Sequence, residues 1–446
     1  MFDVRMIIYE ALLEAAKSDG LAGEIYKDTL SKYAYLDKQQ RAFIHCMLEG
    51  VTERRLTLAY VIDSVSTMPV SKLKKPVRIL LEMGAYQILY MDSVPDRAAV
   101  NETVLIAKKK HLGNLAGFIN GVLRSISRLE GHIDYPKRDK DVTGYLSVYY
   151  SMPELIVRRL IADYGESECE EILKACLAKS PVYARVNTSR TDLETLIGRL
   201  NEYPAVEAAP VSGMDAVRFD KMDSLSDINE FSEGLFTIQD LSSQLLGRVA
   251  GIKKGDTVLD VCASPGGKSL NAADILSGSG KVIACDISDE KITRIKENAQ
   301  RCGFLNISAR VMDASVYNEE LCECADVLIC DVPCSGLGVM GRKNDIRYSI
   351  SDEKLLSLDE LQKKILSNTV KYLKPGGILI FSTCTILKAE NIGNYEYIRD
   401  ELKLTPVPFN DELPENFGCE SAKEGYIQLL PGKLDTDGFF IAKFRR

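Results

Sequence analysis

Two cysteines that follow short apolar runs are the residues best placed to do chemistry. Cys334 comes three residues after a run that ends at Asp331, and Cys384 comes directly after a run over residues 378–383. An apolar run that ends abruptly in polar residues is typical of a buried parallel strand whose carboxyl end opens into a site. We therefore expect the two thiols to lie side by side at neighbouring strand ends.

Two thiols beside a carboxylate suit methyl transfer to carbon 5 of a cytosine. That carbon is too weakly nucleophilic to take a methyl group directly, so a thiolate must first add at carbon 6. A carboxylate near N3 favours this addition, a role that fits Asp331, and a second group must help the C5 proton leave before the thiolate departs. The residues by themselves leave open which of Cys334 and Cys384 is the nucleophile.

A glycine-rich loop follows a third apolar run. Gly266 and Gly267 let the backbone approach a ligand closely, because glycine has no side chain to clash. The spacing of a nucleoside-triphosphate loop is absent, and so is the Asp-Pro-Pro-Tyr signature expected where an exocyclic amine is methylated. Any one acid at a strand end could be a helix cap, but a series of them predicts a nucleotide-like ligand. Four acids end successive predicted strands: Asp260, Asp286, Asp313 and Asp331.

The elements that carry these residues alternate between strand and helix from about residue 240 onward. This alternation predicts an α/β fold with a parallel sheet and helices on both faces, and with ligands at the carboxyl ends of the strands. Two further runs, 426–430 and 438–444, predict a closing hairpin. The predicted strands are 257–262, 281–285, 308–311, 327–330 and 378–381, and the predicted helices are 268–276, 290–302 and 355–372.

The first half of the chain has a different pattern. Residues 2–128 show helical spacing throughout, whereas residues 129–150 lose it and gather Gly131 and Pro136, which predicts a linker. A small α+β module follows. It is predicted to contain a helix pair at 155–176, a strand at 182–190, a helix at 193–200 and short strands over 205–219.

The composition is that of a globular protein of about three domains, with 446 residues, 46% of them hydrophobic. No apolar run reaches the ~20 residues of a membrane span, and the first residues lack the pattern of a signal peptide, so we expect a cytoplasmic protein that binds no membrane. The 12 cysteines are scattered, only 3 histidines occur and no C-x-x-C pair is present. We therefore expect neither a disulfide framework nor a metal site.

The net charge of -8 conceals an uneven distribution of charge. Residues 1–130 carry 18 lysines and arginines against 15 acids, a net charge of +3, so the rest of the chain carries -11. Lysine clusters at 72–75 and 108–110 could bind nucleic-acid phosphates. The alternative is that these lysines simply form solvent-exposed faces of helices.

At two places the motifs resemble known families. Residues 80–91, 94–102 and 117–124 resemble the NusB-like RNA-binding domain, although Asn101 and Asn120 could equally be helix caps or buried hydrogen-bonding residues. The motifs that begin at Asp260, Asp331 and Ser382 resemble those of the RNA cytosine-C5 methyltransferases of the RsmB/Sun/Fmu type, which methylate 16S rRNA. With the NusB-like part in front, the resemblance spans essentially the whole chain.

This resemblance implies a role for each motif residue. Cys384 is the expected nucleophile, Cys334 assists release, Asp331 contacts cytosine N3, and Lys268 is a further catalytic residue. The S-adenosyl-L-methionine site is expected to comprise Cys262, Ala263, Ser264, Pro265, Gly266, Gly267, Lys268, Asp286, Asp313 and Asp331. Contacts with RNA are expected from Arg185, Asn187, Arg342 and Lys343.

The predicted architecture is multidomain. It comprises an all-α NusB-like RNA-binding bundle (1–130), a linker (131–150), a small α+β module (151–238) and an α/β Rossmann-like catalytic domain (239–446). The expected enzyme is a monomer that uses S-adenosyl-L-methionine to methylate 16S rRNA at cytosine 967. Two alternatives stay open: a tRNA cytosine-C5 methyltransferase, and a catalytically inactive RNA-binding ribosome-assembly factor.

Overall fold

The computed structural model describes residues 3–18 and 22–446, and its contacts divide the chain into two units. Unit 1 comprises Met1–Leu177 with Arg342–Ile350, and unit 2 comprises Ala178–Gly341 with Ser351–Arg446. Within these described ranges no helix is long and apolar enough to cross a membrane. The same ranges contain no group of three or more His, Cys, Asp or Glu that could hold a metal ion.

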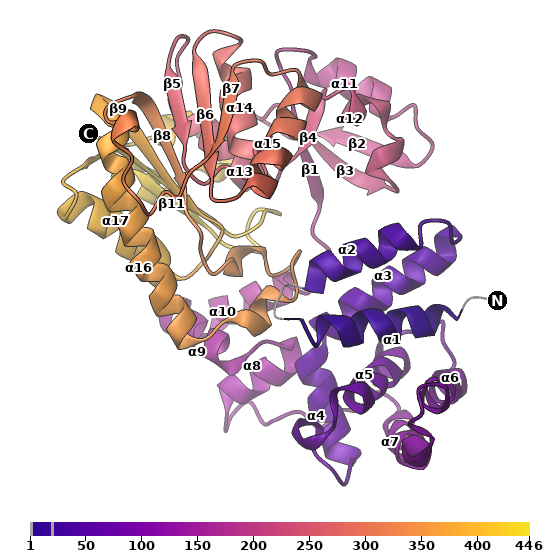
Figure 1. Cartoon of the computed structure of the whole chain (residues 1–446). Coiled ribbons are helices and arrows are strands. Elements are labelled where there is room, and N and C mark those ends of the chain that lie inside the picture. Colours follow the sequence, from indigo (N-terminus) through magenta and orange to yellow (C-terminus); the bar gives the residue numbers. More distant parts are fainter. Residues whose placement is uncertain (1–2, 19–21) are drawn as a thin grey trace. The chain divides into compact units, whose positions relative to one another are not determined.

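Unit 1 is helical, as the spacing of its apolar residues predicts (Figure 1). Its core is formed where the apolar faces meet, with Ile8, Leu48, Leu80 and Leu123 fully buried. The helices are α1 (Val4–Ala15), α2 (Ala22–Lys32), α3 (Lys38–Glu53), α4 (Arg55–Val65), α5 (Lys75–Tyr90), α6 (Asp96–Lys109), α7 (Ala116–Ser127), α8 (Val142–Tyr150), α9 (Glu154–Tyr164) and α10 (Glu166–Ala175). The last two fall in the predicted α+β module but group with unit 1.

Helix α8 lies within residues 131–150, the predicted linker in which the sequence loses its helical spacing. The Asp141 side chain caps it by accepting a hydrogen bond from the Gly144 amide at 2.8 Å. Leu146 and Tyr150 are buried, while Tyr149 on the same helix is exposed. The helix carries apolar and aromatic residues nearly all round, so no amphipathic period marked it in the sequence.

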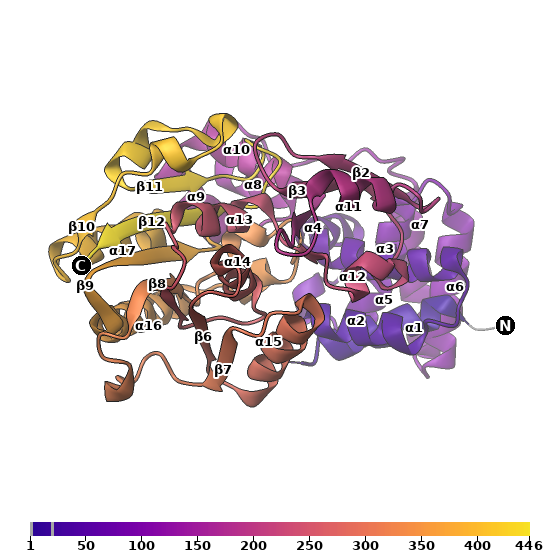
Figure 2. The ribbon, with the colours of Figure 1, turned by 90° about the horizontal axis from the view of Figure 1, so that it is seen from above.

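Unit 2 contains a small antiparallel sheet of four strands in the order β2-β3-β1-β4. Its predicted strands and helix are confirmed. Helix α11 (Leu193–Leu200) lies alongside β2 and β3 (Figure 2), and the short α12 (Asn229–Ser232) precedes the last strand. The strands are β1 (Val182–Val186), β2 (Val206–Pro210), β3 (Ala216–Met222) and β4 (Phe236–Ile238).

The large sheet of unit 2 has the order β10-β12-β9-β8-β5-β6-β7, with β11 paired to β12. Strands β5 to β9 are parallel, and the antiparallel β11–β12 pair confirms the predicted closing hairpin. The strands are β5 (Thr257–Asp260), β6 (Lys281–Asp286), β7 (Ile307–Val311), β8 (Ala325–Asp331), β9 (Leu373–Thr383), β10 (Thr405–Pro406), β11 (Tyr426–Leu429) and β12 (Phe439–Arg445).

Both faces of this sheet are buried, because successive strand residues point to opposite sides. Val258 and Ile380 pack in the core with α13 (Leu241–Val249) and α14 (Gly267–Leu276). Leu259 and Phe381 pack in the core with α16 (Asp352–Thr369) and α17 (Lys388–Asp400), which lie side by side in Figure 1. Helix α15 (Asp289–Cys302) contacts β6 and β7. The chain runs outward from β5 to β7 and then returns to β8, so the switch point lies between β5 and β8, where ligands bind in such folds.

Candidate active site

The two cysteines lie at the carboxyl ends of β8 and β9, which are neighbouring parallel strands. Asp331 at the end of β8 is in register with Ser382 of β9. Cys334 follows Asp331 by three residues and Cys384 follows Ser382 by two, so the register brings both loops to the same edge of the sheet. Their Sγ atoms are 3.4 Å apart, which confirms that the thiols lie side by side.

The two sulfurs share a hydrogen bond that favours a protonated thiol. This bond with Cys384 raises the pKa of Cys334 well above its ordinary value, and burial and the charges of Cys384 and Glu390 raise it further. The Cys334 thiol therefore keeps its proton at neutral pH and can donate to a partner sulfur. Two other cysteines on nearby strands behave as small buried hydrophobic residues: burial raises the pKa of Cys330 to about 12, and Cys285 is fully buried.

Asp331 is held by two donors beside the cysteines. Lys268 Nζ lies 2.6 Å from Asp331 Oδ2, and Ser382 donates to Asp331 Oδ1 at 2.7 Å. Burial lowers the pKa of Lys268, but the charge and hydrogen bond of Asp331 outweigh this effect and the pKa is raised. Lys268 Nζ also lies 5.3 Å from the centre of the Phe439 ring. The carboxylate is thus fixed in place and faces a permanent cation.

The glycine-rich loop joins β5 to α14 and is tied to the end of β6. Gly266 has a φ of +109°, a conformation that glycine alone adopts easily, and it immediately precedes the first residue of α14. Asp286 Oδ2 accepts from the Ser264 amide at 2.9 Å, and Lys291 Nζ lies 2.9 Å from Asp286 Oδ1. The loop backbone therefore stands beside Asp286, one of the acids predicted to hold the S-adenosyl-L-methionine.

The residues around this loop fit an adenosine-bearing ligand. Among the described residues no side chain caps the amino end of helix α14, Asp286 supplies a carboxylate, and Asp313 is exposed just beyond β7. Apolar side chains are exposed beside the two acids: Ile287 is 60% exposed and Val311 is 47% exposed. Such apolar surface next to carboxylates is what an aromatic base and its ribose would cover.

Asp260 differs from the other strand-end acids because it is fully buried. Its Oδ2 accepts from the Ser269 hydroxyl at 2.6 Å, and its Oδ1 has no hydrogen-bond partner among the described residues. Burial raises the pKa of Asp260 to about 7. Asp260 ties β5 to α14 underneath the loop.

A buried acid that the sequence analysis missed stands behind the two cysteines. Glu390 lies in the first turn of α17 and is 3% exposed. It accepts hydrogen bonds from Ser335 and Thr385, the residues that directly follow the two cysteines. The only sequence signal was that each cysteine is followed by a hydroxyl residue, which does not reveal their shared partner.

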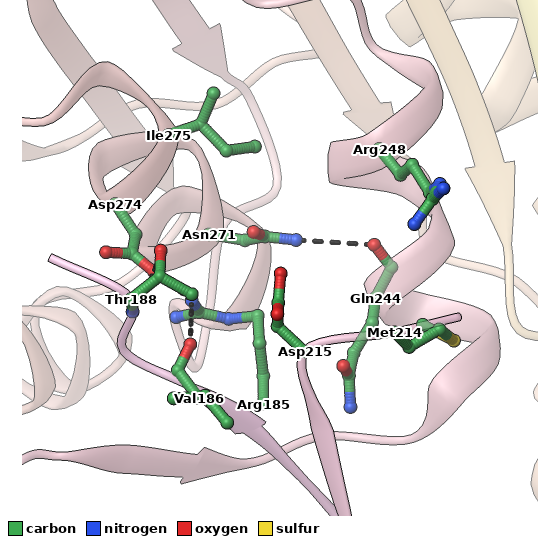
Figure 3. Close-up of a pocket in the computed structure, with 10 residues that line it drawn as sticks. All are labelled: Arg185, Val186, Thr188, Met214, Asp215, Gln244, Arg248, Asn271, Asp274 and Ile275. Atoms are coloured by element: carbon green, nitrogen blue, oxygen red, sulfur yellow. Dashed lines mark hydrogen bonds and ion pairs between the residues drawn. The ribbon is translucent and has the colours of Figure 1, made fainter. Parts of the chain in front are cut away.

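Arg185 and Asn187, which were predicted to contact RNA, are buried inside unit 2. Arg185 Nη1 lies 2.9 Å from Asp274 Oδ2 of α14, and both side chains are almost fully buried (Figure 3). Asn187 Nδ2 donates to the carbonyls of Gly234 and Cys302 at 2.9 and 3.0 Å. Both residues therefore join the small sheet to the catalytic sheet, and their polar groups are directed at the protein.

Arg342 and Lys343 are exposed in the segment that groups with unit 1. With Tyr26 and Glu49 they line a hollow of about 290 Å³. The segment is anchored there, since the Tyr348 hydroxyl donates to the Thr52 carbonyl at 2.9 Å. Contact of Arg342 and Lys343 with the substrate backbone stays a prediction.

Comparison with known proteins matches three parts of the chain to described families. Residues 249–445 match the model of the 16S rRNA methyltransferase RsmB/F family, residues 3–128 match the NusB family, and residues 152–225 match the ferredoxin-like domain of RsmF/B-like methyltransferases. A probable ribosomal RNA small subunit methyltransferase B of Bacillus subtilis is 34% identical over 99% of this chain and 98% of the relative.

Further relatives agree with this match. A probable ribosomal RNA small subunit methyltransferase B of Synechocystis is 28% identical over the full length of both chains. A crystal structure of a methyltransferase homolog protein from Pyrococcus horikoshii is 26% identical, with a TM-score of 0.58 over 68% of this chain and 97% of that one.

Proposed function

The chain belongs to the RsmB/F family of 16S rRNA methyltransferases and is an S-adenosyl-L-methionine-dependent RNA (cytosine-5)-methyltransferase, and we propose that its own substrate is cytosine 967 of 16S rRNA. The cofactor supplies an electrophilic methyl group when bound. Cys262–Lys268, Asp286 and Asp313 would hold it, with Asp331 at the side of the cytosine. The observation that carries the proposal is the pair of sulfurs 3.4 Å apart beside a fixed carboxylate.

In the proposed reaction Cys384 attacks as a thiolate. Its sulfur forms a bond to C6 of the cytosine, and the electrons of the C5–C6 double bond make C5 nucleophilic. Asp331, held by Lys268 and Ser382, faces N3 and stabilises the protonated ring. Once Cys384 is bonded to C6, its hydrogen bond and charge no longer hold the proton on Cys334, which can lose it to water. After C5 has gained the methyl group, the Cys334 thiolate takes the C5 proton, the electrons of the C5–H bond re-form the C5–C6 double bond, and the S–C6 bond breaks so that Cys384 departs as a thiolate.

The cytosine must leave its base stack to be attacked at C6 on one face, so the proposal includes base flipping. We further propose the division into a NusB-like part (1–130), a linking region (131–150), a small module (151–238) and a catalytic domain (239–446), acting as a monomer. The net positive charge of residues 1–130 supports RNA binding by the first part.

A denaturing gel tests the covalent step. Protein, 16S rRNA and S-adenosyl-L-methionine are mixed, and wild type is compared with Cys334→Ala and Cys384→Ala. We expect Cys334→Ala to accumulate a slow-migrating RNA adduct, because attack proceeds and release fails, and Cys384→Ala to form none. An adduct with Cys384→Ala alone would reverse the two roles.

Methyl transfer by the same protein preparation is then compared between 16S rRNA and tRNA. We expect methyl incorporation into 16S rRNA and none into tRNA, and the reverse would favour the tRNA alternative. Absence of both incorporation and adduct, with normal binding of the cofactor, would refute the proposed substrate; loss of cofactor binding would support the inactive assembly factor.

A further inference from the structure

Glu390 collects four hydrogen bonds in a site from which water is almost excluded. Its Oε2 accepts from the Ser335 amide at 2.9 Å and from Gln362 Nε2 at 3.0 Å. Its Oε1 accepts from the Ser335 hydroxyl at 2.5 Å and from the Thr385 hydroxyl at 3.3 Å. These four hydrogen bonds offset the cost of burying the Glu390 carboxylate.

The donors come from both cysteine loops. Ser335 directly follows Cys334, Thr385 directly follows Cys384, and their hydroxyls are 2.6 Å from each other. A backbone hydrogen bond from the Gly338 amide to the Cys384 carbonyl, at 2.9 Å, is a further link between the loops. Both cysteine loops therefore donate hydrogen bonds to the same residue, Glu390.

A further layer of buried amides holds Glu390 itself in place. Gln362 of α16 is fully buried and also donates to the Pro333 carbonyl at 3.0 Å. Asn394 of α17 donates to Gln362 Oε1 at 2.7 Å and to the Glu390 carbonyl at 2.8 Å. Glu390 and Gln362 connect α17 and α16 to residues adjacent to Cys334 and Cys384, and Asn394 holds these two residues together.

We propose that Glu390 is a positioning residue that clamps the two cysteine loops so that both sulfurs reach one cytosine ring in turn. This inference rests on the proposed function for its purpose, and on the hydrogen bonds above for its geometry. One thiol must attack and the other must assist release at the same base, and a misplacement of about 1 Å can cost on the order of 100-fold in rate. Loops beyond the strand ends lack the regular backbone hydrogen bonds that hold neighbouring strands together, so other contacts must fix their positions.

The clamp is tested first without RNA or cofactor, by disulfide formation between Cys334 and Cys384. Diamide takes one hydrogen from each thiol at its N=N bond and becomes a hydrazine, while the two sulfurs form the S–S bond. The rate depends on how often the sulfurs stand at bonding geometry. Mass spectrometry of the disulfide-linked peptides measures the Cys334–Cys384 bond separately from any bond that the other cysteines form.

Three variants separate the clamp from general stability. Glu390→Ala removes all four acceptor contacts. Glu390→Gln keeps them, because its carbonyl oxygen can accept from the two N–H donors while its amide donates to the two hydroxyls, which can rotate. Asp274→Asn is the matched control, since Asp274 is another 3% exposed carboxylate that accepts hydrogen bonds from four donors.

We expect Glu390→Ala to form the Cys334–Cys384 disulfide at least about tenfold more slowly than wild type, and the other two variants to stay within about threefold. In methylation assays we expect kcat to fall about 10- to 100-fold for Glu390→Ala with KM for RNA unchanged, and to recover in Glu390→Gln. If Glu390→Ala does not fold, the double variant Ser335→Ala/Thr385→Val replaces it, with the same expectation.

A folded Glu390→Ala protein that forms the disulfide at the wild-type rate would overturn the clamp, and so would an equal slowing in Asp274→Asn. Because the disulfide assay needs no substrate, a wild-type protein that methylates no RNA would refute the proposed function and leave this test intact.

Discussion

Replacing Gly338 by alanine places a methyl group where two other backbone segments already stand. A Cβ at this position would lie 2.0 Å from the Gly438 carbonyl oxygen and 2.8 Å from that of Cys384. Ordinary contact begins at 3.4 Å, so the surrounding backbone must move by roughly 1.4 Å. Backbone cannot rotate away as a side chain can, so the movement falls on the loop that carries Cys384 or on the segment before β12.

The structure sets the size of the two expected effects. Gly338 donates to the Cys384 carbonyl and accepts from the Gly438 amide, each at 2.9 Å, and the shift breaks at least one of these bonds. Overpacking with a lost hydrogen bond lowers the free energy of unfolding by about 2–4 kcal/mol. Displacement of Cys384 by about 1 Å lowers kcat about 100-fold, which corresponds to about 2.7 kcal/mol in the barrier.

Urea denaturation and methyl transfer to 16S rRNA measure the two effects. Gly393→Ala is the matched control, because this glycine lies in α17 of the same unit and its nearest neighbour is 4.0 Å from the new Cβ. Alanine there stabilises the helix by about 0.5–1 kcal/mol and should leave kcat unchanged. If Gly338→Ala retains kcat within threefold and unfolds at the wild-type urea concentration, the close approach does not position Cys384.

Three further changes test other parts of unit 2. Lys268→Met removes the cation that lies 2.6 Å from Asp331, and these two side chains are only 15% and 24% exposed. We expect the free energy of unfolding, measured by urea titration, to fall by about 2 kcal/mol, and kcat for methyl transfer to fall about 100-fold. Arg185→Met leaves the Asp274 carboxylate buried without its cation and should lower the free energy of unfolding by about 3 kcal/mol. The double variant Arg185→Met/Asp274→Leu should recover most of this loss, and a double variant as unstable as the single one would contradict the pairing. Asp260 has an ordinary pKa of 3.8 and a folded pKa of about 7, so the folded state binds its proton more tightly, and the free energy of unfolding falls as pH rises between these values and is level above them. Asp260→Asn should remove this fall, which amounts to about 2 kcal/mol or more between about pH 5 and about pH 8. An unchanged pH profile in urea titrations of the variant would show that Asp260 does not cause the fall.

The sequence by itself determined the strands of the catalytic sheet and the meeting of its cysteines. Short apolar runs that end in Asp331 and Thr383 are local signals, and the carboxyl ends of neighbouring parallel strands must share an edge. The expectation that Cys334 and Cys384 lie side by side therefore depended only on the two strands being neighbours. The order itself, with β8 beside both β5 and β9, is seen only in the structure.

Only the tertiary structure decided what the polar side chains between these elements do. Arg185 reads as a surface cation in the sequence, but packing of the small sheet on α14 buries it against Asp274, 89 residues away. Glu390 looks like an ordinary acid in the first turn of a helix, yet α16, α17 and two loops converge on it. The segment Arg342–Ile350 follows a catalytic loop in the chain and packs within unit 1. Such partners depend on which surfaces meet in three dimensions and leave no periodic pattern in the sequence, whereas strands and helices do, because their spacing of apolar residues is set by the local backbone geometry.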